Sequence, residues 1–379
     1  MPPAAWEKWA AEFARQYEYE DDMRAWSHII GTGSATPERV LTNLDLERIV
    51  ETSDDWIIRR TGIRERRISS LQRPENTAEM ATAAAVQAME TACIDPSELD
   101  MVVVGTVTPD RQFPSTGCMV QTALGAHRAA AFDISAGCSG FLYALNTVHN
   151  AVQCGAVQKA LVIGVERLSS VLNWEDRGTC VLLGDGAGAV VVSADREEGG
   201  VLSTHIRSDG RYWDLLYSYY GENHLPASVD HLDAKPYKLR MEGNRLFKKA
   251  IGFLTEIAQE ALEHNGMTSK DIKLVVPHQA NIRIIQGLVR NLDIPMEQVY
   301  TNVDRYGNTS SASIPIALDE AQGRGLLMPG DHVLLVSFGA GLTWASALIR
   351  WSMEEVFPKA EDVVRRSIEQ GQTVLPTVP

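Results

Sequence analysis

The stretch DISAGCSGFLYAL (133–145) has a counterpart in the same chain, DRYGNTSSASIPIAL (304–318). Both place glycine and other small residues directly before a segment whose apolar residues have helical spacing. Two further pairs recur in the same order: SELDMVVVGTVTP (97–109) with TSKDIKLVVPHQA (268–280), and GAVQKALVIGVE (155–166) with MPGDHVLLVSFG (328–339). Each pair is separated by about 170 residues. The sequence therefore predicts two duplicated halves.

Short apolar runs predict strands that are covered on both faces, because they lack polar alternation. These runs are MVVVGTV (101–107), ALVIGV (160–165), LVV (274–276) and HVLLVSF (332–338). Two longer segments, 139–154 and 244–265, have helical spacing instead, and Gly155 is a typical residue to end the first. Strands that alternate with helices indicate an α/β fold.

The duplication divides the chain into four expected parts. An N-terminal extension covers 1–22, the first half 23–197 carries the candidate nucleophile, the second half 198–352 carries the candidate His and Asn, and a tail covers 353–379. We expect the halves to differ chiefly by an insertion at 208–238, which is polar and rich in tyrosine.

Composition excludes several classes of protein. With 379 residues, 45% of them hydrophobic, the chain is long enough for a large core. A formal net charge of −14 disfavours nucleic acid or an anionic membrane as the main partner. No apolar run approaches the roughly 20 residues of a membrane span. The five scattered cysteines contain no Cys-x-x-Cys pair, which argues against disulfides and a zinc site and favours a reducing cytoplasm.

Cys138 lies at the centre of the opening stretch, at the start of a predicted helix. A helix N-terminus presents unpaired N–H groups and the positive end of the dipole, which lower the pKa of a thiol and can hold an oxyanion. A lone cysteine is more often buried and inert, and we keep that interpretation for Cys93, Cys118, Cys154 and Cys180. The flanking glycines and the matched motif in the second half favour a nucleophile at Cys138.

His278 and Asn308 are the other candidates. His278 follows a predicted buried strand, at the kind of strand end where α/β proteins gather their chemistry, although a structural histidine is an equally good interpretation of its position alone. Asn308 would by itself be an ordinary turn or N-cap residue, and only its equivalence with Cys138 makes it a candidate.

Together these residues suit acyl transfer followed by carbon–carbon bond formation. Cys138 would attack a thioester and hold the acyl group. Neutral His278 and Asn308 would donate hydrogen bonds to a second thioester carbonyl and stabilise the enolate left when a malonyl group loses carbon dioxide. In SFGAGLTW (337–344), either a simple β-turn or an oxyanion hole is expected, the latter formed by the N–H groups of Ala340 and Cys138.

The sequence resembles the β-ketoacyl-acyl carrier protein synthase III family over about 28–351. The matching stretches are GTGSATPERVLTNLDLERIVETSDDWIIRRTGIRERRI (31–68), SAGCSGF (135–141), DRGTCVLLGDGAGAVV (176–191), VPHQANIRII (276–285), DRYGNTSSASIPIALDEA (304–321) and SFGAGLTWASALIRW (337–351). The resemblance implies a thiolase-like fold with five layers, αβαβα, in a homodimer. It also implies Cys138 as the nucleophile and His278 and Asn308 as the decarboxylation donors.

The resemblance further implies that coenzyme A thioesters are substrates and that no cofactor is needed. Trp56 and Arg177 would sandwich adenine, as aromatic and guanidinium groups can do, and Arg60 would lie near the phosphates. The other residues expected along the coenzyme A arm are Gly178, Asn244, Phe247 and Asn281.

The family pattern also implies an acyl pocket and a carrier-protein surface. Phe113 would reach into the pocket of the partner subunit and favour short primers, or be a plain loop residue; Leu182 and Leu183 would line the pocket. A local basic patch would receive the acidic carrier protein, and its expected residues are Lys248, Lys249, Arg283 and Arg290. Ala340 and Ala345 stand where many relatives have glycine, which puts the shape of the pocket in doubt more than the chemistry.

Other functions remain open from the sequence. A papain-like peptidase also uses Cys, His and Asn in this order, but SAGCSGF has no aromatic residue after the cysteine. A thiolase proper needs a reactive cysteine in the second half, yet the last cysteine is Cys180. A relative of the same fold could condense acyl units or transfer an acyl group in specialised metabolism. A non-catalytic binding protein would not need all three candidate residues.

Overall fold

The first half of the chain forms one mixed sheet of five strands in the order β1-β7-β6-β4-β5. Strand β4 runs parallel to both β5 and β6, whereas β7 runs antiparallel to β6 and β1. The strands are β1 (Trp26–Ala35), β4 (Met101–Gly105), β5 (Ala130–Ile134), β6 (Lys159–Arg167) and β7 (Asp185–Asp195). The computed structural model describes residues 25–70, 75–218 and 239–353.

The second half forms a four-stranded sheet in the order β11-β12-β13-β8. Its strands are β8 (Gly200–Ser208), β11 (Leu274–Pro277), β12 (His332–Gly339) and β13 (Thr343–Arg350). Strands β11 and β12 are parallel, as β4 and β6 are, and β13 is antiparallel to β12 and β8. The place of β5 is taken by one parallel bridge between Val275 and Val299. The two sheets therefore repeat one topology, as the duplication predicts.

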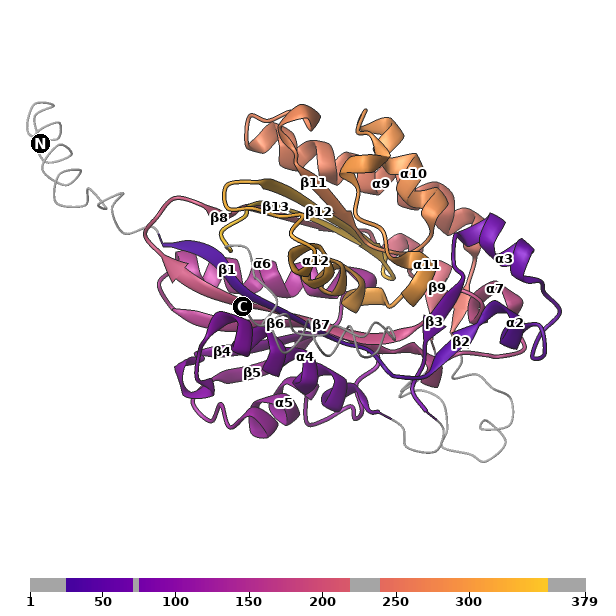
Figure 1. Ribbon diagram of the computed structural model, residues 1–379, viewed down its shortest axis with the longest axis horizontal. Coiled ribbons are helices and arrows are strands. Elements are labelled where there is room, and N and C mark those ends of the chain that lie inside the picture. Colours follow the sequence, from indigo (N-terminus) through magenta and orange to yellow (C-terminus); the bar gives the residue numbers. More distant parts are fainter. Residues whose placement is uncertain (1–24, 71–74, 219–238, 354–379) are drawn as a thin grey trace, which may run out of the picture.

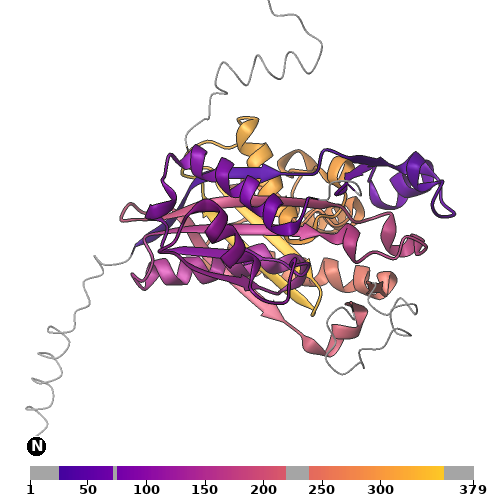
Figure 2. The same cartoon turned by 90° about the horizontal axis from the view of Figure 1, so that it is seen from below.

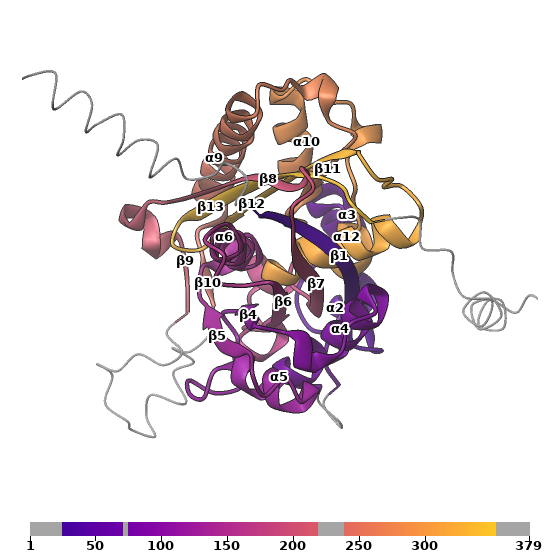
Figure 3. The ribbon, with the colours of Figure 1, turned by 90° about the vertical axis from the view of Figure 1, so that its left-hand side faces the viewer.

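Helices divide the molecule into the five expected layers (Figures 1 and 3). Helices α4 (Thr77–Ala92) and α5 (Thr116–Leu124) cover the outer face of the first sheet, and α9 (Gly243–His264) and α10 (Ile282–Asn291) cover that of the second. Helices α6 (Gly140–Gln153) and α12 (Ser313–Gly323) lie between the sheets. The predicted α/β thiolase-like arrangement is confirmed.

Strand β4 shows why the layers form. Val103 faces the central helices, whereas Val102 and Val104 face the outer helices, and all three are fully buried. A strand whose two faces are both covered needs apolar residues without alternation, because neither face meets water. The predicted strands at 101–107, 160–165, 274–276 and 332–338 each correspond to an observed strand, with ends that differ by a few residues.

Helix α6 carries the apolar face predicted for it. Phe141, Leu142, Leu145, Val148 and Val152 are all buried in the central layer. Gly155, with a φ of 72°, follows the end of the helix in the left-handed conformation. The second predicted helix corresponds to α9, which ends one residue before the expected position.

Short elements of both halves form one end of the molecule, beyond the ends of the central strands (Figures 1 and 2). They are β2 (Val40–Thr42), α2 (Asn43–Leu46), α3 (Asp54–Thr61), β3 (Glu65–Arg67), α7 (Arg177–Cys180), β9 (Leu216–Tyr217), β10 (Arg240–Met241) and α11 (Val303–Tyr306). Arg66 is fully buried there and donates to Leu41 O, Asn43 Oδ1 and Val181 O. These bonds join β3 to the loop after α7.

Several predicted segments lie outside the described residues, namely the extension 1–22, nearly all of the tail 353–379 and positions 219–238 of the insertion. The predicted boundary between the halves falls in the connection from β7, which ends at Asp195, to β8, which begins at Gly200. Within the described residues, no helix has the length and apolar character needed to cross a membrane.

Candidate active site

Cys138 lies in a short 3₁₀ turn, η3 (Gly137–Ser139), between the end of β5 and the start of α6. Two glycines allow this turn to meet the loop after β12. A Cβ atom on Gly339 would lie 2.4 Å from Cys138 N, and one on Gly137 would lie 2.5 Å from Ala340 N. Both separations are far below van der Waals contact, so only glycine fits at either position.

The contact between η3 and the loop after β12 brings the backbone of Ala340 beside that of Cys138. Thr343 Oγ1 fixes the loop by donating to Ala136 O at 2.7 Å. Ala340 and Cys138 both line the same cavity. Their N–H groups remain the predicted oxyanion hole.

The expected lowering of the Cys138 pKa is wrong for the free protein. Burial raises the pKa of Cys138 to about 12; a hydrogen bond with Ser310 acts in the opposite direction, and the nearby Glu166 carboxylate raises the pKa further. Desolvation therefore outweighs the N–H groups of the helix start. At neutral pH the residue is a thiol, which needs a base before it can attack a thioester.

His278 follows β11 directly, and its backbone N–H donates to Val336 O at 2.8 Å. Its Nδ1 lies 2.7 Å from Ser313 Oγ, near the start of α12. Burial lowers the pKa of His278 to about 3, so the imidazole is neutral at physiological pH. A neutral ring held at Nδ1 can present Nε2 to the cavity as a hydrogen-bond donor without giving up a proton.

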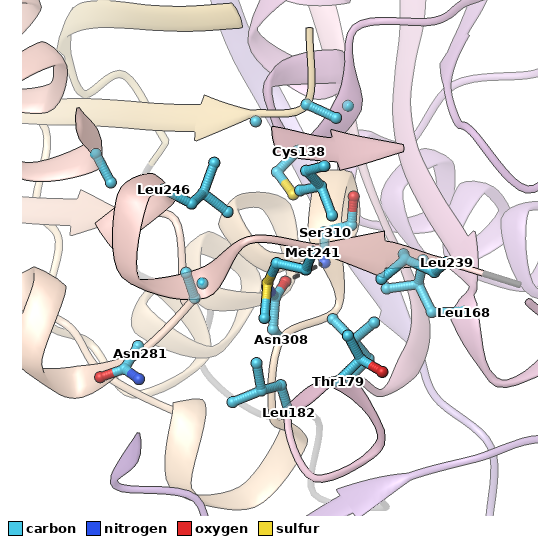
Figure 4. Close-up of a pocket in the computed structure, with 18 of the residues that line it drawn as sticks. Cys138, Leu168, Thr179, Leu182, Leu239, Met241, Leu246, Asn281, Asn308 and Ser310 are labelled. Carbon is cyan, nitrogen blue, oxygen red and sulfur yellow. Dashed lines mark hydrogen bonds between the residues drawn. The ribbon is translucent and has the colours of Figure 1, made fainter. Parts of the chain in front are cut away.

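Asn308 lies just before η8 (Ser310–Ala312), the 3₁₀ turn that leads into α12. Its backbone forms a parallel bridge with Leu183, with its N–H donating to Leu182 O at 2.8 Å. Its side-chain Oδ1 accepts from Ser310 N at 2.8 Å (Figure 4). The oxygen is thereby engaged, which orients the amide nitrogen as the donor of this side chain.

One cavity of about 470 Å³ brings Cys138, His278 and Asn308 together. Cys138 comes from the first half of the chain and the other two residues from the second, because η3 and η8 precede the two central helices and contact each other. Figure 4 shows Cys138, Ser310 and Asn308 in the centre of the view, with Leu246 and Asn281 to their left and Leu168 and Leu239 to their right. Positions 138 and 308, which the sequence predicts to be equivalent, thus line the same cavity.

Trp56 and Arg177 lie in contact at one end of the molecule. The guanidinium carbon of Arg177 is 4.7 Å from the centre of the Trp56 ring, and that of Arg60 is 5.6 Å away. An adenine between two stacked groups needs about 7 Å, twice the usual contact distance. Trp56 and Arg177 are therefore too close together in this structure for the predicted sandwich, and Arg177 also donates to Glu51 O at 3.0 Å.

The other residues predicted for the coenzyme A arm lie along the cavity. Arg60, Gly178, Asn244, Phe247 and Asn281 all line it, and Asn281 Nδ2 donates to Arg60 O at 3.1 Å. These residues come from α3, α7, α9 and the start of α10. The lining thus forms a path from the end of the molecule to Cys138.

The predicted acyl-pocket residues divide into two groups. Leu182 and Leu183 line the cavity, whereas Phe113 is 82% exposed and absent from its lining. Apolar residues that the sequence analysis did not single out complete the wall: Leu168, Val171, Leu239, Met241 and Leu246. No local motif marks them, since each is an ordinary apolar residue brought in by the fold.

The predicted basic residues lie on α9 and α10, and one of the four, Arg283, lines the cavity. Lys248, Arg283 and Arg290 are exposed, and the Arg283 guanidinium lies 5.3 Å from the centre of the Phe247 ring. Lys249 differs, because its Nζ donates to Tyr212 Oη at 3.0 Å and lies over the Tyr212 ring. This lysine is already engaged within the chain.

Sequence reasoning missed Ser310, which lines the cavity, and Glu166, which Ser310 contacts. Glu166 is fully buried at the end of β6, and Ser310 Oγ donates to it at 3.1 Å. The signal was present, because Glu166 is a charged residue at the end of the apolar run ALVIGV, just as His278 follows LVV. Applied to both halves, the strand-end criterion would have found it.

Known proteins are similar to this chain over most of its length. The chain matches family models for 3-oxoacyl-[acyl-carrier-protein] synthase III over residues 132–210 and for its C-terminal part over residues 262–351. The β-ketoacyl-[acyl-carrier-protein] synthase III of Caldanaerobacter subterraneus is 49% identical over 324 residues, 86% of this chain and 97% of that protein.

Solved structures show the same relationship. The 3-oxoacyl-[acyl-carrier-protein] synthase III of Aquifex aeolicus has a TM-score of 0.80 at 46% identity, covering 86% of this chain and 100% of that one. The priming β-ketosynthase of a polyketide biosynthetic pathway has a TM-score of 0.81 at 36% identity, covering 87% and 97%. These relationships exclude the papain-like peptidase and confirm the resemblance: the chain belongs to the β-ketoacyl-acyl carrier protein synthase III family.

Proposed function

We propose that the chain catalyses a decarboxylative Claisen condensation of an acyl-CoA primer with malonyl-acyl carrier protein, giving a 3-oxoacyl-acyl carrier protein that starts a fatty acid. The observation that carries this proposal is the convergence of Cys138, His278 and Asn308 on one cavity. Relatives at 46–49% identity bear the name of this synthase. The reaction makes the chain an acyltransferase.

In the first half-reaction, Cys138 Sγ attacks the carbonyl carbon of the acyl-CoA. The oxyanion that forms accepts hydrogen bonds from the N–H groups of Cys138 and Ala340, and its collapse expels the coenzyme A thiol. The apolar wall formed by Leu182, Leu183 and their neighbours holds the acyl chain. The acyl group is left as a thioester on Cys138.

In the second half-reaction, malonyl-acyl carrier protein enters the same cavity. His278 and Asn308 donate to its thioester carbonyl and stabilise the enolate that forms as carbon dioxide leaves. Because the pKa of His278 is about 3, its Nε2 holds a hydrogen bond without protonating the carbanion. The enolate carbon attacks the acyl-Cys138 carbonyl and releases the thiol. The thioesters supply the reactive carbon atoms, so this route calls for no cofactor or metal.

We propose the partners of this protein from the charge and exposure of its surface residues. Exposed Lys248, Arg283 and Arg290 offer positive charge to an acidic carrier protein, despite the overall net charge of −14. The exposed ring of Phe113 is suited to burial against a second copy, in a homodimer. We assign no role to nucleic acid or membrane, and we place the protein in the cytoplasm, where coenzyme A thioesters and free thiols fit its chemistry.

Intact-mass analysis with a panel of acyl-CoAs, with and without malonyl-acyl carrier protein, tests this function. We expect a mass increase equal to one acyl group on the wild type, which malonyl-acyl carrier protein then removes as 3-oxoacyl product. Cys138→Ala should acquire no acyl group. Acylation that persists in this variant, or hydrolysis without product, would contradict the proposal.

A second candidate is priming of a specialised pathway by the same chemistry. The observation in its favour is the relationship with the polyketide priming ketosynthase. Competition between carrier proteins of fatty-acid and polyketide synthesis, each loaded with malonate, distinguishes the two. Exclusive use of the polyketide carrier would support the second candidate.

A further inference from the structure

Ser310 is a serine held in a backbone conformation that suits glycine. It lies at the start of η8, is buried, and has a φ of 51°, in the left-handed region. A residue with a Cβ atom is strained there, and glycine, asparagine and aspartate are the usual occupants. Such a conformation persists only where the surrounding structure holds it. The contacts of Ser310 therefore indicate what this position does.

The backbone N–H of Ser310 orients the proposed enolate donor, Asn308. It donates to Asn308 Oδ1 at 2.8 Å, a hydrogen bond drawn as a dashed line in Figure 4. Because a backbone N–H can only donate, the oxygen of the amide faces Ser310 and the nitrogen does not. The opposite orientation would place Oδ1 where the enolate oxygen needs a donor. The direction of one N–H group thus decides whether Asn308 can stabilise the enolate.

The side chain of Ser310 is anchored on Glu166. Ser310 Oγ donates to Glu166 Oε1 at 3.1 Å, and Glu166 is fully buried at the end of β6. Burial raises the pKa of Glu166 to about 7. Within the described residues, no basic side chain forms a salt bridge with this carboxyl group. Its oxygens therefore depend on hydrogen-bond donors, as a buried polar group requires.

The loop after β4 holds Glu166 in place from the first half of the chain. Val107 N donates to both carboxyl oxygens at 3.2 Å, and Thr106 Oγ1 and Thr108 Oγ1 donate to Oε2. The Thr108 oxygen also accepts from Arg167 N at 2.8 Å, which leaves its own hydrogen for Glu166. Glu166 is thus a fixed point against which a side chain of the second half can be positioned.

We propose that Ser310 is a positioning residue for malonyl decarboxylation: its hydroxyl, bound to Glu166, fixes the N–H group that turns the Asn308 amide nitrogen to the cavity. The proposal rests on the function proposed above, because it assigns Ser310 to the step in which Asn308 is a donor. Ser310 exchanges no proton in this step. Removal of its hydroxyl should slow decarboxylation and leave the acylation of Cys138 nearly unchanged.

Two substitutions at position 310 separate positioning from stability. Ser310→Ala and Ser310→Gly both remove the hydroxyl, but glycine also relieves the strain at a φ of 51°, so it should have the higher midpoint of urea unfolding. Both variants should nevertheless lose roughly 10- to 100-fold in the kcat of malonyl decarboxylation, less than the loss of a whole donor. Their KM for malonyl-acyl carrier protein should stay within about twofold of wild type, because the donor acts chiefly on the transition state.

Acylation of Cys138 by acetyl-CoA is the internal reference for these variants. We expect its single-turnover rate to stay within about threefold of wild type in both, because that step does not use Asn308. Equal loss of acylation and decarboxylation would contradict the proposal. Decarboxylation rates that rank in the order of stability, with Ser310→Gly well above Ser310→Ala, would contradict it as well.

Ser311→Ala is the matched control. Ser311 is the next residue of η8, is also buried, and also donates to Glu166 Oε1, at 3.2 Å, but its shortest hydrogen bond goes to Gly105 O at 2.7 Å. We expect this variant to lose stability with the missing hydrogen bonds and to decarboxylate within about twofold of the wild-type rate. A loss as large as that of Ser310→Gly would indicate general damage to η8 and overturn the proposal.

Glu166→Gln tests the anchor. Glutamine has one acceptor oxygen where glutamate has two, so it cannot accept from all the donors that surround position 166. We expect a loss in decarboxylation similar to that of Ser310→Gly. The double variant should be no slower than the slower single variant, because the two residues act through one contact. Losses that multiply, or an unchanged rate in Glu166→Gln, would overturn the anchor.

Crystal structures of the free wild type and of Ser310→Gly test the geometry without any substrate. We expect the Asn308 side chain to keep its contact with the N–H of residue 310 in the wild type and to turn away from it in the variant. An unmoved Asn308 would overturn the proposal. Absence of carbon dioxide release by the wild type would instead contradict the proposed function, and the structural comparison would still decide whether Ser310 positions Asn308.

Discussion

His278 Nδ1 and Ser313 Oγ lie 2.7 Å apart, and the N–H of Gln279 points to the same hydroxyl at 3.4 Å. While it accepts from Gln279, the Ser313 hydroxyl can donate its own hydrogen to Nδ1 of His278. In that arrangement the imidazole hydrogen is on Nε2. We therefore expect Ser313 to favour the tautomer that can donate to a thioester carbonyl.

We expect Ser313→Ala to slow malonyl decarboxylation by roughly 10- to 100-fold, the usual effect of losing a partner that orients an imidazole. Acyl transfer to Cys138 should remain within about twofold of wild type, because that step does not use His278. Measuring carbon dioxide release and acyl-enzyme formation separately checks this division. Equal loss of both steps would contradict the role assigned to Ser313.

Removing either donor should separate the two half-reactions more completely. His278→Ala and Asn308→Ala are expected to retain acylation by acyl-CoA and to lose decarboxylation by at least about 100-fold, the effect of removing one donor from a developing oxyanion. Rapid-quench analysis of acyl-enzyme and of malonyl-acyl carrier protein provides the measurement. Decarboxylation that survives in both variants would be incompatible with their proposed function.

Gly339 is expected to tolerate no side chain. A methyl group there would lie 2.4 Å from Cys138 N, so Gly339→Ala must displace the turn that holds the nucleophile. We expect about 1–3 kcal/mol of lost stability and at least a 100-fold slower acylation. Denaturant unfolding and single-turnover kinetics measure the two effects.

Gly252 in α9 offers the matched control, since no atom lies within 4 Å of a Cβ added there. Gly252→Ala should stabilise the protein by about 0.5–1 kcal/mol through the helix propensity of alanine, with unchanged acylation. A Gly339→Ala variant as active as Gly252→Ala would show that the close approach is unimportant.

The nucleotide contacts can be tested by comparing two thioesters. Trp56→Ala and Arg177→Ala should raise the KM for acyl-CoA by roughly 10-fold, since each removes a stacking surface of about 1–2 kcal/mol. Their rates with acyl-N-acetylcysteamine, which has no adenine, should equal the wild-type rate. Equal impairment with both substrates would indicate a structural role for the pair.

Stability should depend on pH through His278. The pKa of His278 is near 3 in the folded protein and 6.5 in the reference state. Between these two pH values, the unfolded chain therefore binds a proton at His278 that the folded chain does not bind. Its contribution is present above pH 6.5 and is lost as the pH falls towards 3, by about 1.4 kcal/mol per pH unit.

The difference in the free energy of unfolding between wild type and His278→Ala isolates this contribution. Other titratable groups contribute almost equally in the two proteins, so their effects largely cancel. Glu166, which changes the stability with pH in the opposite direction, is one of these groups. Urea unfolding at pH 7, 6, 5 and 4 provides the measurement. We expect the free energy of unfolding of the wild type to fall more steeply with acidification than that of the variant. Parallel curves would show that His278 is protonated in the folded protein.

The sequence predicted the fold because its signals were long and repeated. Apolar runs such as 101–107 indicate strands covered on both faces, and the recurrence of 133–145 at 304–318 locates equivalent helix starts. Placing Cys138 and Asn308 together followed from that symmetry. Short elements such as β2 and β3 were not predicted, because three residues carry too little pattern.

Properties that depend on three-dimensional surroundings could not be read from the sequence. The helix start at Cys138 was visible, but the desolvation that raises its pKa comes from residues far along the chain. The contact between Trp56 and Arg177 joins segments about 120 residues apart, and its close stacking depends on side-chain conformation. The sequence alone does not distinguish Lys249 from its neighbour Lys248. In the fold, Tyr212 lies beside Lys249.

The contact between η3 and the loop after β12 makes catalytic activity depend on the packing of the two halves. Gly137 and Gly339 let the two halves of the chain touch backbone to backbone, with the proposed nucleophile in one half and the proposed enolate donors in the other. Neither half by itself holds a complete set of reactive groups. We therefore expect the rate of turnover to depend closely on how the two halves pack. As denaturant is added, activity should be lost at a lower concentration than that at which either sheet unfolds.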